Sequence, residues 1–91
     1  MQSRAEIIVN GLVQGVGFRY FVYREAVALG VTGFTKNLYS GDVQTIVEGE
    51  KVLIEDLIEK IRVGPSHASV KKCWIDWQEP KNEFNSFTIS N

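Results

Sequence analysis

The chain is 91 residues long, 44% of its residues are hydrophobic, and its formal net charge is −1. This length suits one domain spanning residues 1–91 with one core, and the apolar content is that of a globular protein rather than a disordered one. Basic residues are scattered, and the densest basic spot is the pair Lys71-Lys72. Because nucleic-acid-binding proteins carry a basic surface that neutralises phosphates, the composition excludes a nucleic-acid partner and argues equally against a membrane-surface role.

The N-terminal residues and the cysteine content indicate where the protein works. The sequence begins Met-Gln-Ser-Arg-Ala-Glu, which lacks the continuous apolar stretch of a signal peptide, and no later run is long enough for a transmembrane helix. Cys73 is the only cysteine, so no internal disulfide can form. These features predict a cytoplasmic protein. Cys73 lies in an alternating apolar pattern and is expected to be a small core residue rather than a reactive thiol.

The first elements expected along the chain are a strand and a helix. Residues 6–13 are rich in β-branched and apolar side chains and end at a glycine-rich turn, which predicts a strand. Between residues 18 and 29 the apolar residues recur every three or four positions, as they do on one face of a helix. Gly30 is placed to end that helix.

Two strands joined by a tight turn follow, and then a second helix. Residues 31–38 predict the second strand, Ser40-Gly41-Asp42 has turn chemistry, and residues 43–47 alternate apolar and polar side chains like a half-buried third strand. Residues 51–63 carry an apolar stripe with charged residues on the other side, which predicts an amphipathic helix. Gly64-Pro65 ends it.

The last part of the chain predicts two more strands. Residues 70–77 alternate, with Cys73, Ile75 and Trp77 on one face, and Trp77 is expected in the core. Residues 84–89 predict a short final strand. The order of elements indicates an α+β fold, a ferredoxin-like βαββαβ sandwich with two helices on one face of a mostly antiparallel sheet, plus a short C-terminal strand.

Residues 11–19, Gly-Leu-Val-Gln-Gly-Val-Gly-Phe-Arg, form the first candidate site, where the first strand meets the first helix. Gly15 and Gly17 let the backbone turn sharply and approach a ligand closely. The start of the helix presents unpaired N–H groups at residues 16–19, backed by the positive end of the helix dipole, and these suit a phosphate. Arg19 adds a permanent positive charge and a fork of donors for phosphate oxygens.

A plain structural turn is the alternative interpretation of this loop, and the glycine spacing alone favours it. Two common phosphate-binding motifs are excluded. A dinucleotide-binding fingerprint requires glycine where this chain has Tyr20, and a Walker A loop requires a Gly-Lys-Ser/Thr triplet that the sequence lacks.

Residues 33–37, Gly-Phe-Thr-Lys-Asn, form the second candidate site. Asparagine is disfavoured in strands, so Asn37 stands out in the predicted second strand. The functional interpretation is that its amide holds a water molecule. The alternative, which the sequence alone favours, is a strand-end residue that bonds to local turn backbone. Lys36 is expected to be a solvated side chain.

Other reactive side chains form no convincing site. His67, the only histidine, follows the end of a helix and is expected at the surface, and no Ser-His-Asp set is possible without it. Metal sites need several Cys, His or carboxylate ligands at suitable spacing, and none is found, so neither a metal nor another cofactor is predicted. Glu55, Asp56 and Glu59 lie on the polar side of their helix and are expected to be solvated.

The stretch from Gly11 to Arg19, the stretch from Gly33 to Asn37 and the hairpin after it strongly resemble the acylphosphatase family, and the resemblance covers essentially the whole chain. It implies an enzyme that hydrolyses acyl phosphates to carboxylate and inorganic phosphate. It also implies that loop amides bind the phosphate, that Arg19 grips the phosphoryl group and that Asn37 orients the attacking water. The implied phosphate-binding residues are Gln14, Gly15, Val16, Gly17, Phe18 and Arg19, and the implied catalytic residues are Arg19 and Asn37.

This sequence departs from the usual family pattern in minor ways. Thr35 stands where Val is common, Gln44 stands where an acidic residue is frequent, and Ser40-Gly41-Asp42 replaces an Asp-Gly turn. None of these positions belongs to the implied catalytic pair. The implied partners are a small acyl phosphate substrate and inorganic phosphate, as product and inhibitor, and the chain is expected to act as a monomer.

The implied chemistry agrees with the residues available, because a carboxylate leaves without a general acid and phosphoryl transfer depends mostly on positioning and charge stabilisation. Three alternatives share the fold. An RNA-recognition module is disfavoured because the predicted first and third strands contain no aromatic residue. A domain that binds anions without turnover is the second. The third is the N-terminal domain of a hydrogenase-maturation carbamoyltransferase, in which zinc-binding repeats follow, whereas this chain stops at Asn91.

Overall fold

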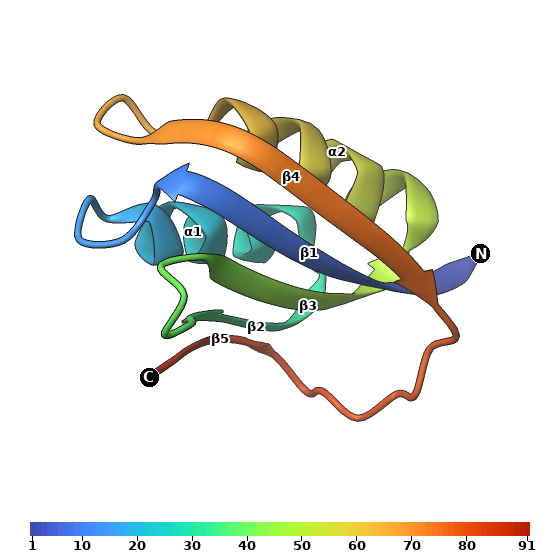
Figure 1. The fold of residues 1–91 in the computed structure, drawn as a ribbon. Coiled ribbons are helices and arrows are strands. Elements are labelled where there is room, and N and C mark those ends of the chain that lie inside the picture. Colours follow the sequence, from blue (N-terminus) through green and yellow to red (C-terminus); the bar gives the residue numbers. More distant parts are fainter.

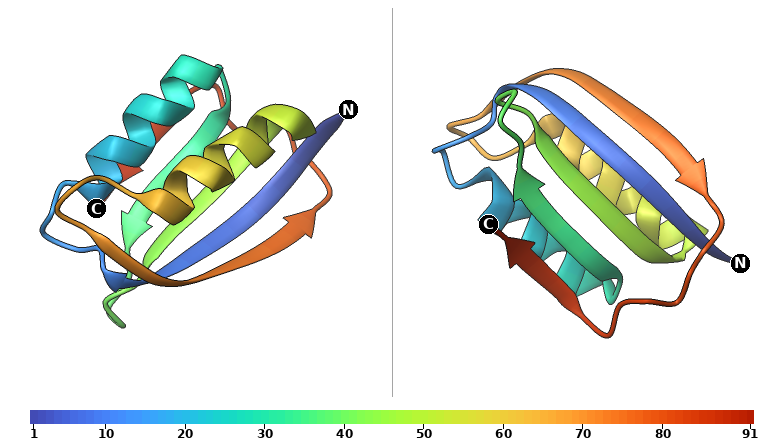
Figure 2. Two further views of the ribbon diagram at one scale, coloured as in Figure 1. Left: turned by 90° about the horizontal axis from the view of Figure 1, so that it is seen from above. Right: turned by 60° about the horizontal axis from the view of Figure 1, so that its bottom comes forward.

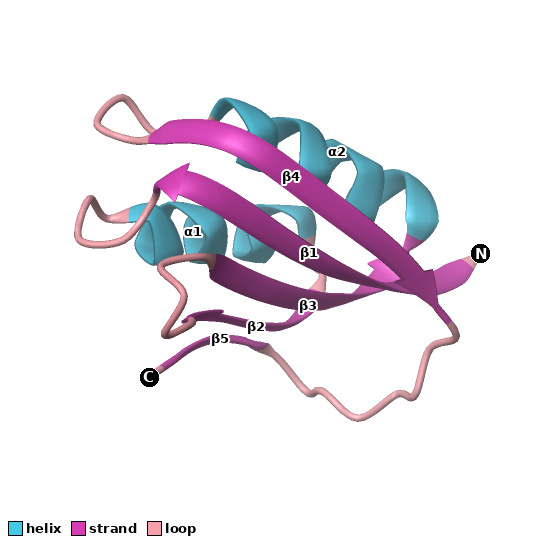
Figure 3. Cartoon of the chain, viewed as in Figure 1, coloured by secondary structure: helices cyan, strands magenta, loops and turns pink.

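The computed structural model describes all of residues 1–91, in which two helices cover one face of a five-stranded sheet (Figures 1 and 2). The strand order is β4-β1-β3-β2-β5, and every neighbouring pair is antiparallel except β2 and β5. Figure 3 shows the same view by type of secondary structure. The predicted ferredoxin-like arrangement is confirmed. In chain order the elements are β1 (Gln2–Leu12), α1 (Phe18–Leu29), β2 (Thr32–Asn37), β3 (Val43–Glu50), α2 (Lys51–Val63), β4 (Ser69–Gln78) and β5 (Phe87–Ser90).

The bounds of both helices agree with the sequence prediction, whereas the strands β1, β3 and β5 differ from it. β3 ends at Glu50 rather than at residue 47. β1 begins at Gln2 rather than at residue 6, because its first residues pair with the end of β3, Gln2 opposite Glu50. β5 begins at Phe87 rather than at residue 84. The ring of Phe84 packs edge-on against Phe34, with 6.0 Å between centroids, before the β5 pairing starts.

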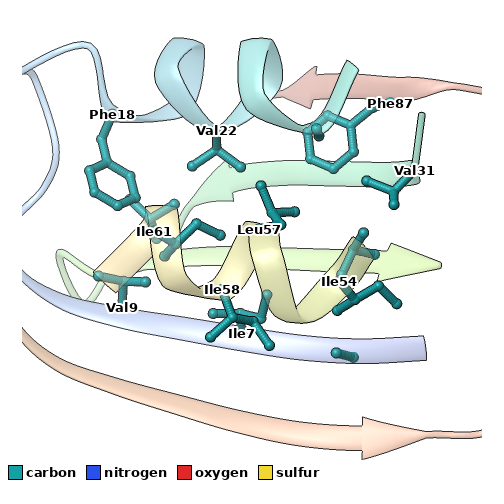
Figure 4. Packing of buried hydrophobic residues seen from close by; sticks show 14 of the residues in the cluster. Ile7, Val9, Phe18, Val22, Val31, Ile54, Leu57, Ile58, Ile61 and Phe87 are labelled. Carbon is teal, nitrogen blue, oxygen red and sulfur yellow. The ribbon is translucent and has the colours of Figure 1, made fainter. Parts of the chain in front are cut away.

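The hydrophobic core lies between the sheet and the two helices (Figure 4). Phe18, the first residue of α1, is 1% exposed, so burial of its ring fixes the start of the helix and the loop before it. Burying a side chain of this size contributes roughly 1.5–3 kcal/mol. The core cluster comprises Ala5, Ile7, Val9, Val13, Phe18, Val22, Ala26, Val31, Val43, Val47, Ile54, Leu57, Ile58, Ile61 and Phe87.

Two expectations for β4 have different outcomes. Cys73 is partly buried and packs against the core, and burial raises the pKa of its thiol. The expectation that Trp77 is a core residue is wrong, because its side chain is 40% exposed. β4 is an edge strand, and Trp77 lies next to its last residue, with Lys51 Nζ 5.1 Å from the centroid of the Trp77 ring.

Residues 79–86, here called the strap, connect β4 at one edge of the sheet to β5 at the other edge (Figure 1). The strap lies against the face of the sheet that the helices leave open. The backbone N–H groups of Lys81 and Asn82 donate to the carboxylate of Glu48 at 2.7 and 2.9 Å. The sheet is therefore covered on both faces along part of β1 and β3, and Arg4 and Glu48 are buried there.

Candidate active site

The loop between β1 and α1 reverses the chain with two glycines in the left-handed region. Gly15 has φ +76° and Gly17 has φ +77°, values that residues with a Cβ atom rarely adopt. Gly17 is the N-cap of α1, and no side chain caps the helix there. The first N–H groups of α1 therefore have no helical or side-chain partner, which leaves them available to an anion.

This loop, α1 and the ends of β2 and β5 surround a pocket of about 180 Å³. The guanidinium of Arg19 is held at the pocket by one hydrogen bond, from Nη1 to the backbone carbonyl of Ser90 at 2.9 Å. No carboxylate lies within 4.0 Å of it, so its charge is not neutralised by an ion pair. The residues that line the pocket are Val13, Gly15, Gly17, Phe18, Arg19, Tyr20, Asn37 and Ile89.

Asn37, the last residue of β2, faces the same pocket as Arg19. Its amide oxygen, Oδ1, is buried and has no hydrogen-bond partner, and no other buried side-chain N or O atom lacks one. A buried acceptor without a donor costs about 1–3 kcal/mol. Such an atom, in the same pocket as Arg19 and the uncapped start of α1, is suited to receive a hydrogen bond from a bound water or ligand.

Comparison with known proteins agrees with this geometry. A model of the Acylphosphatase family matches residues 5–89. The chain belongs to the acylphosphatase family. It is 51% identical to the acylphosphatase of Chlorobaculum tepidum, over 97% of this chain and 96% of that protein. The crystal structure of acylphosphatase from Bacillus subtilis has a TM-score of 0.94, 32% identity and full coverage of both chains. HypF from T. kodakarensis is also similar, with TM-score 0.85 and 32% identity over 98% of this chain but 12% of HypF.

Acylphosphatases hydrolyse acyl phosphates. In this chain the side chain of Gln14 fixes the loop between β1 and α1. Its Nε2 atom donates to the backbone carbonyls of Leu38 and Asp42, both at 2.8 Å, and thereby ties the loop to the turn between β2 and β3. Asn10 braces the same turn, because its Nδ2 atom donates to the Asp42 carboxylate at 2.9 Å.

The structure places the predicted residues of this acylphosphatase in two groups. Gly15, Gly17, Phe18, Arg19 and Asn37 line the pocket together, although they come from two separate sequence motifs. Gln14 and Val16 do not line it. The side chain of Gln14 faces a second groove of about 610 Å³, whose other lining residues are Lys36, Asn37, Leu38, Tyr39 and Asn91.

Sequence reasoning missed two residues at the pocket and one contact. Tyr20 and Ile89 line it, and the Ser90 carbonyl holds Arg19. Tyr20 lies directly after Arg19 at the start of α1, so its position is the one signal that identifies it. Ile89 and the Ser90 carbonyl reach the pocket only because β5 pairs with β2, which no local pattern reveals.

No group of three or more His, Cys, Asp or Glu side chains is arranged to hold a metal ion. Neither helix is long and apolar enough to cross a membrane.

Proposed function

We propose that this acylphosphatase works without a metal ion, with loop Gln14–Arg19 binding the phosphoryl group through its backbone N–H groups, Arg19 neutralising its charge and Asn37 orienting the attacking water. Inorganic phosphate, which presents the same oxygens, binds in the same place as product and competitive inhibitor. The protein acts as a monomer in the cytoplasm, in keeping with its single free cysteine.

The reaction follows from what these groups supply. The water oxygen attacks phosphorus while the bond between phosphorus and the carboxyl oxygen breaks, and the carboxylate leaves with the bonding electrons. One proton of the water passes to a phosphate oxygen, which balances the reaction without a protein base. Charge on the phosphoryl oxygens is stabilised by Arg19 and by the N–H groups at the start of α1.

The buried and unpartnered Oδ1 atom of Asn37 is the observation that carries the proposal. An amide oxygen accepts hydrogen bonds, so a water seated in the pocket donates one of its hydrogens to Oδ1. That bond leaves the oxygen lone pair of the water free to point at phosphorus. Asn37 therefore acts on the nucleophile, whereas Arg19 acts on the anion.

We expect Asn37→Ala to lower kcat about a hundredfold while the inhibition constant of inorganic phosphate stays unchanged. Misplacing a nucleophile costs on the order of a hundredfold in rate, and an interaction made only as the reaction proceeds affects kcat rather than ground-state binding. Asn37→Asp should not restore the rate, because its charge would face the phosphoryl oxygens.

Hydrolysis of benzoyl phosphate in the presence of a chelator provides the assay, and Asn85→Ala is the matched control because Asn85 is exposed in the strap. Equal losses in kcat and in phosphate affinity would place Asn37 on the anion instead of the water. Loss of wild-type activity with chelator, and its recovery with magnesium, would show that the metal-free mechanism is wrong.

A further inference from the structure

Two exposed apolar side chains lie at the pocket that holds Arg19 and Asn37, and the reaction proposed above gives them no role. Tyr20, in the first turn of α1, is 59% exposed, and Ile89, on β5, is 39% exposed. Both line the pocket. Single exposed apolar residues need no explanation, but two that meet at one binding pocket from different elements indicate a ligand contact.

We infer that Tyr20 and Ile89 form the subsite for the acyl group of the substrate, and that this subsite favours acyl phosphates with an apolar, especially aromatic, acyl group. The inference rests on the proposed function, because it requires the phosphoryl group to sit on the loop. It names a substrate class that the phosphate-binding residues cannot select, since they contact only the part that all acyl phosphates share.

The direction of the reaction supports this assignment. The attacking and leaving oxygens lie roughly in line on opposite sides of phosphorus. The water is placed at Asn37, whose Oδ1 atom is buried. The carboxylate therefore leaves on the side of phosphorus away from Asn37, and the exposed Tyr20 and Ile89 side chains are apolar groups of this pocket that are available to contact its acyl part.

The ring of Tyr20 is already held in place by neighbours on its own helix. It stacks on Tyr23 with 6.2 Å between centroids and an interplanar angle of 22°, and the guanidinium carbon of Arg24 lies 5.8 Å from its centroid. A ring that is held before the ligand arrives loses little conformational freedom on binding. An aromatic acyl group can then contact the exposed part of this ring and the methyl groups of Ile89.

The second groove, beside Tyr39 and Lys36, is the rival place for the acyl group, because it is larger and also reaches Asn37. It is lined by Asn37 but not by the loop glycines or Arg19. An acyl group in that groove would approach phosphorus from the side of the proposed water. In-line displacement does not allow the leaving group to occupy that side.

The test compares kcat/KM for benzoyl phosphate and acetyl phosphate in the full chain and its variants. We expect the wild type to prefer benzoyl phosphate, and Tyr20→Ala and Ile89→Ala each to lower that preference, by about tenfold for Tyr20→Ala. Tyr20→Phe should keep the preference, because the ring rather than the hydroxyl makes the contact. The inhibition constant of inorganic phosphate should be the same in all of these variants.

Tyr39→Ala is the matched control, since Tyr39 is an exposed tyrosine that lines the second groove instead. A preference unchanged in both Tyr20→Ala and Ile89→Ala, or lowered by Tyr39→Ala, would overturn the inference. The side chains of Tyr20 and Ile89 are exposed, so replacing either with alanine should not prevent folding. At Tyr20 alanine also favours the helix. If the wild type hydrolysed neither compound, the proposed function itself would fail, which is a different result from an unchanged preference.

Discussion

Arg4 and Arg19 show the difference between an arginine paired inside the protein and an arginine proposed to bind substrate in the same small domain. Arg4 is 6% exposed and donates to three side chains: Glu48 at 2.8 Å, Glu83 at 2.7 Å and Gln78 at 3.0 Å. Arg19 donates once, to the Ser90 carbonyl, and has no carboxylate within 4.0 Å. The guanidinium of Arg4 is neutralised inside the protein, whereas that of Arg19 has no ion-pair partner.

The surroundings of the two arginines follow from this difference. Around Arg4 every buried polar side chain is paired, and the strap closes over the cluster. Around Arg19 the helix start is uncapped and the Asn37 oxygen lacks a donor. Unpaired polar groups cost stability, so a folded chain retains them where a ligand completes them.

The comparison predicts the largest effect for Arg19→Ala, measured as turnover of benzoyl phosphate. A charge-assisted hydrogen bond contributes about 1.5–3 kcal/mol, and two such bonds to phosphoryl oxygens correspond to a loss of roughly a hundredfold to ten-thousandfold in rate. Affinity for inorganic phosphate should fall as well. Arg19→Lys should restore little, because an ammonium cannot reproduce the fork of donors.

Thermal unfolding of the same variant decides whether Arg19 is free of a structural role. We expect its melting temperature to stay near that of the wild type, with Arg62→Ala, an exposed arginine on α2, as the control for activity. An Arg19→Ala protein that is unfolded under mild conditions would place Arg19 in the same class as Arg4. One that kept most of its turnover would remove Arg19 from the mechanism.

Glu48→Gln should have the reverse pattern, a large loss of stability with little change in the kcat of the folded protein. Breaking a buried ion pair by removing one charge costs about 3–5 kcal/mol, because Arg4 would stay charged and buried. Urea unfolding measures the stability, and benzoyl phosphate hydrolysis well below the transition measures kcat. A drop in kcat without a loss of stability would contradict the structural assignment of this cluster.

Glu83→Gln is the control for Glu48→Gln, because it removes an exposed partner of Arg4 instead of a buried one. Glu83 also pairs with Arg4, but its side chain is 47% exposed, so water screens the pair. We expect a loss of about 1 kcal/mol or less. Equal losses for Glu48→Gln and Glu83→Gln would show that burial does not set the strength of these pairs.

The sequence predicts the surroundings of Arg19 better than those of Arg4. The residues 18–29 and 51–63 could be predicted as helices because a 3.6-residue apolar period is a local signal, and the loop before the first of them carries its own glycine and arginine motif. Arg4 gave no signal, because a charged residue near the N-terminus is normally solvated. Its burial depends on Glu48, Glu83 and the strap, which come from distant parts of the chain.

In the candidate site, too, local motifs could be predicted from the sequence and contacts between distant segments could not. Arg19 and the loop glycines belong to one short motif, and Asn37 to another, so both could be singled out from the sequence. Their meeting at one pocket, the Ser90 contact and the position of Ile89 depend on the parallel pairing of β5 with β2. The roles of Arg19 and Asn37 stay predictions until the variants are measured.

Acidification should gradually weaken the ion pair between Arg4 and Glu48. Burial alone would raise the pKa of the Glu48 carboxyl, but hydrogen bonds from Lys81 N–H, the Arg4 guanidinium and Asn82 N–H outweigh it and lower that pKa below its ordinary value. A carboxyl whose pKa is lowered by folding contributes stability above its unfolded pKa, about 4.3, and loses that contribution as pH falls through the folded pKa. The stability difference between wild type and Glu48→Gln in urea should therefore be constant near neutral pH and shrink below about pH 4. A difference that stayed constant down to the lowest pH at which both proteins fold would show that the Glu48 charge does not stabilise the strap.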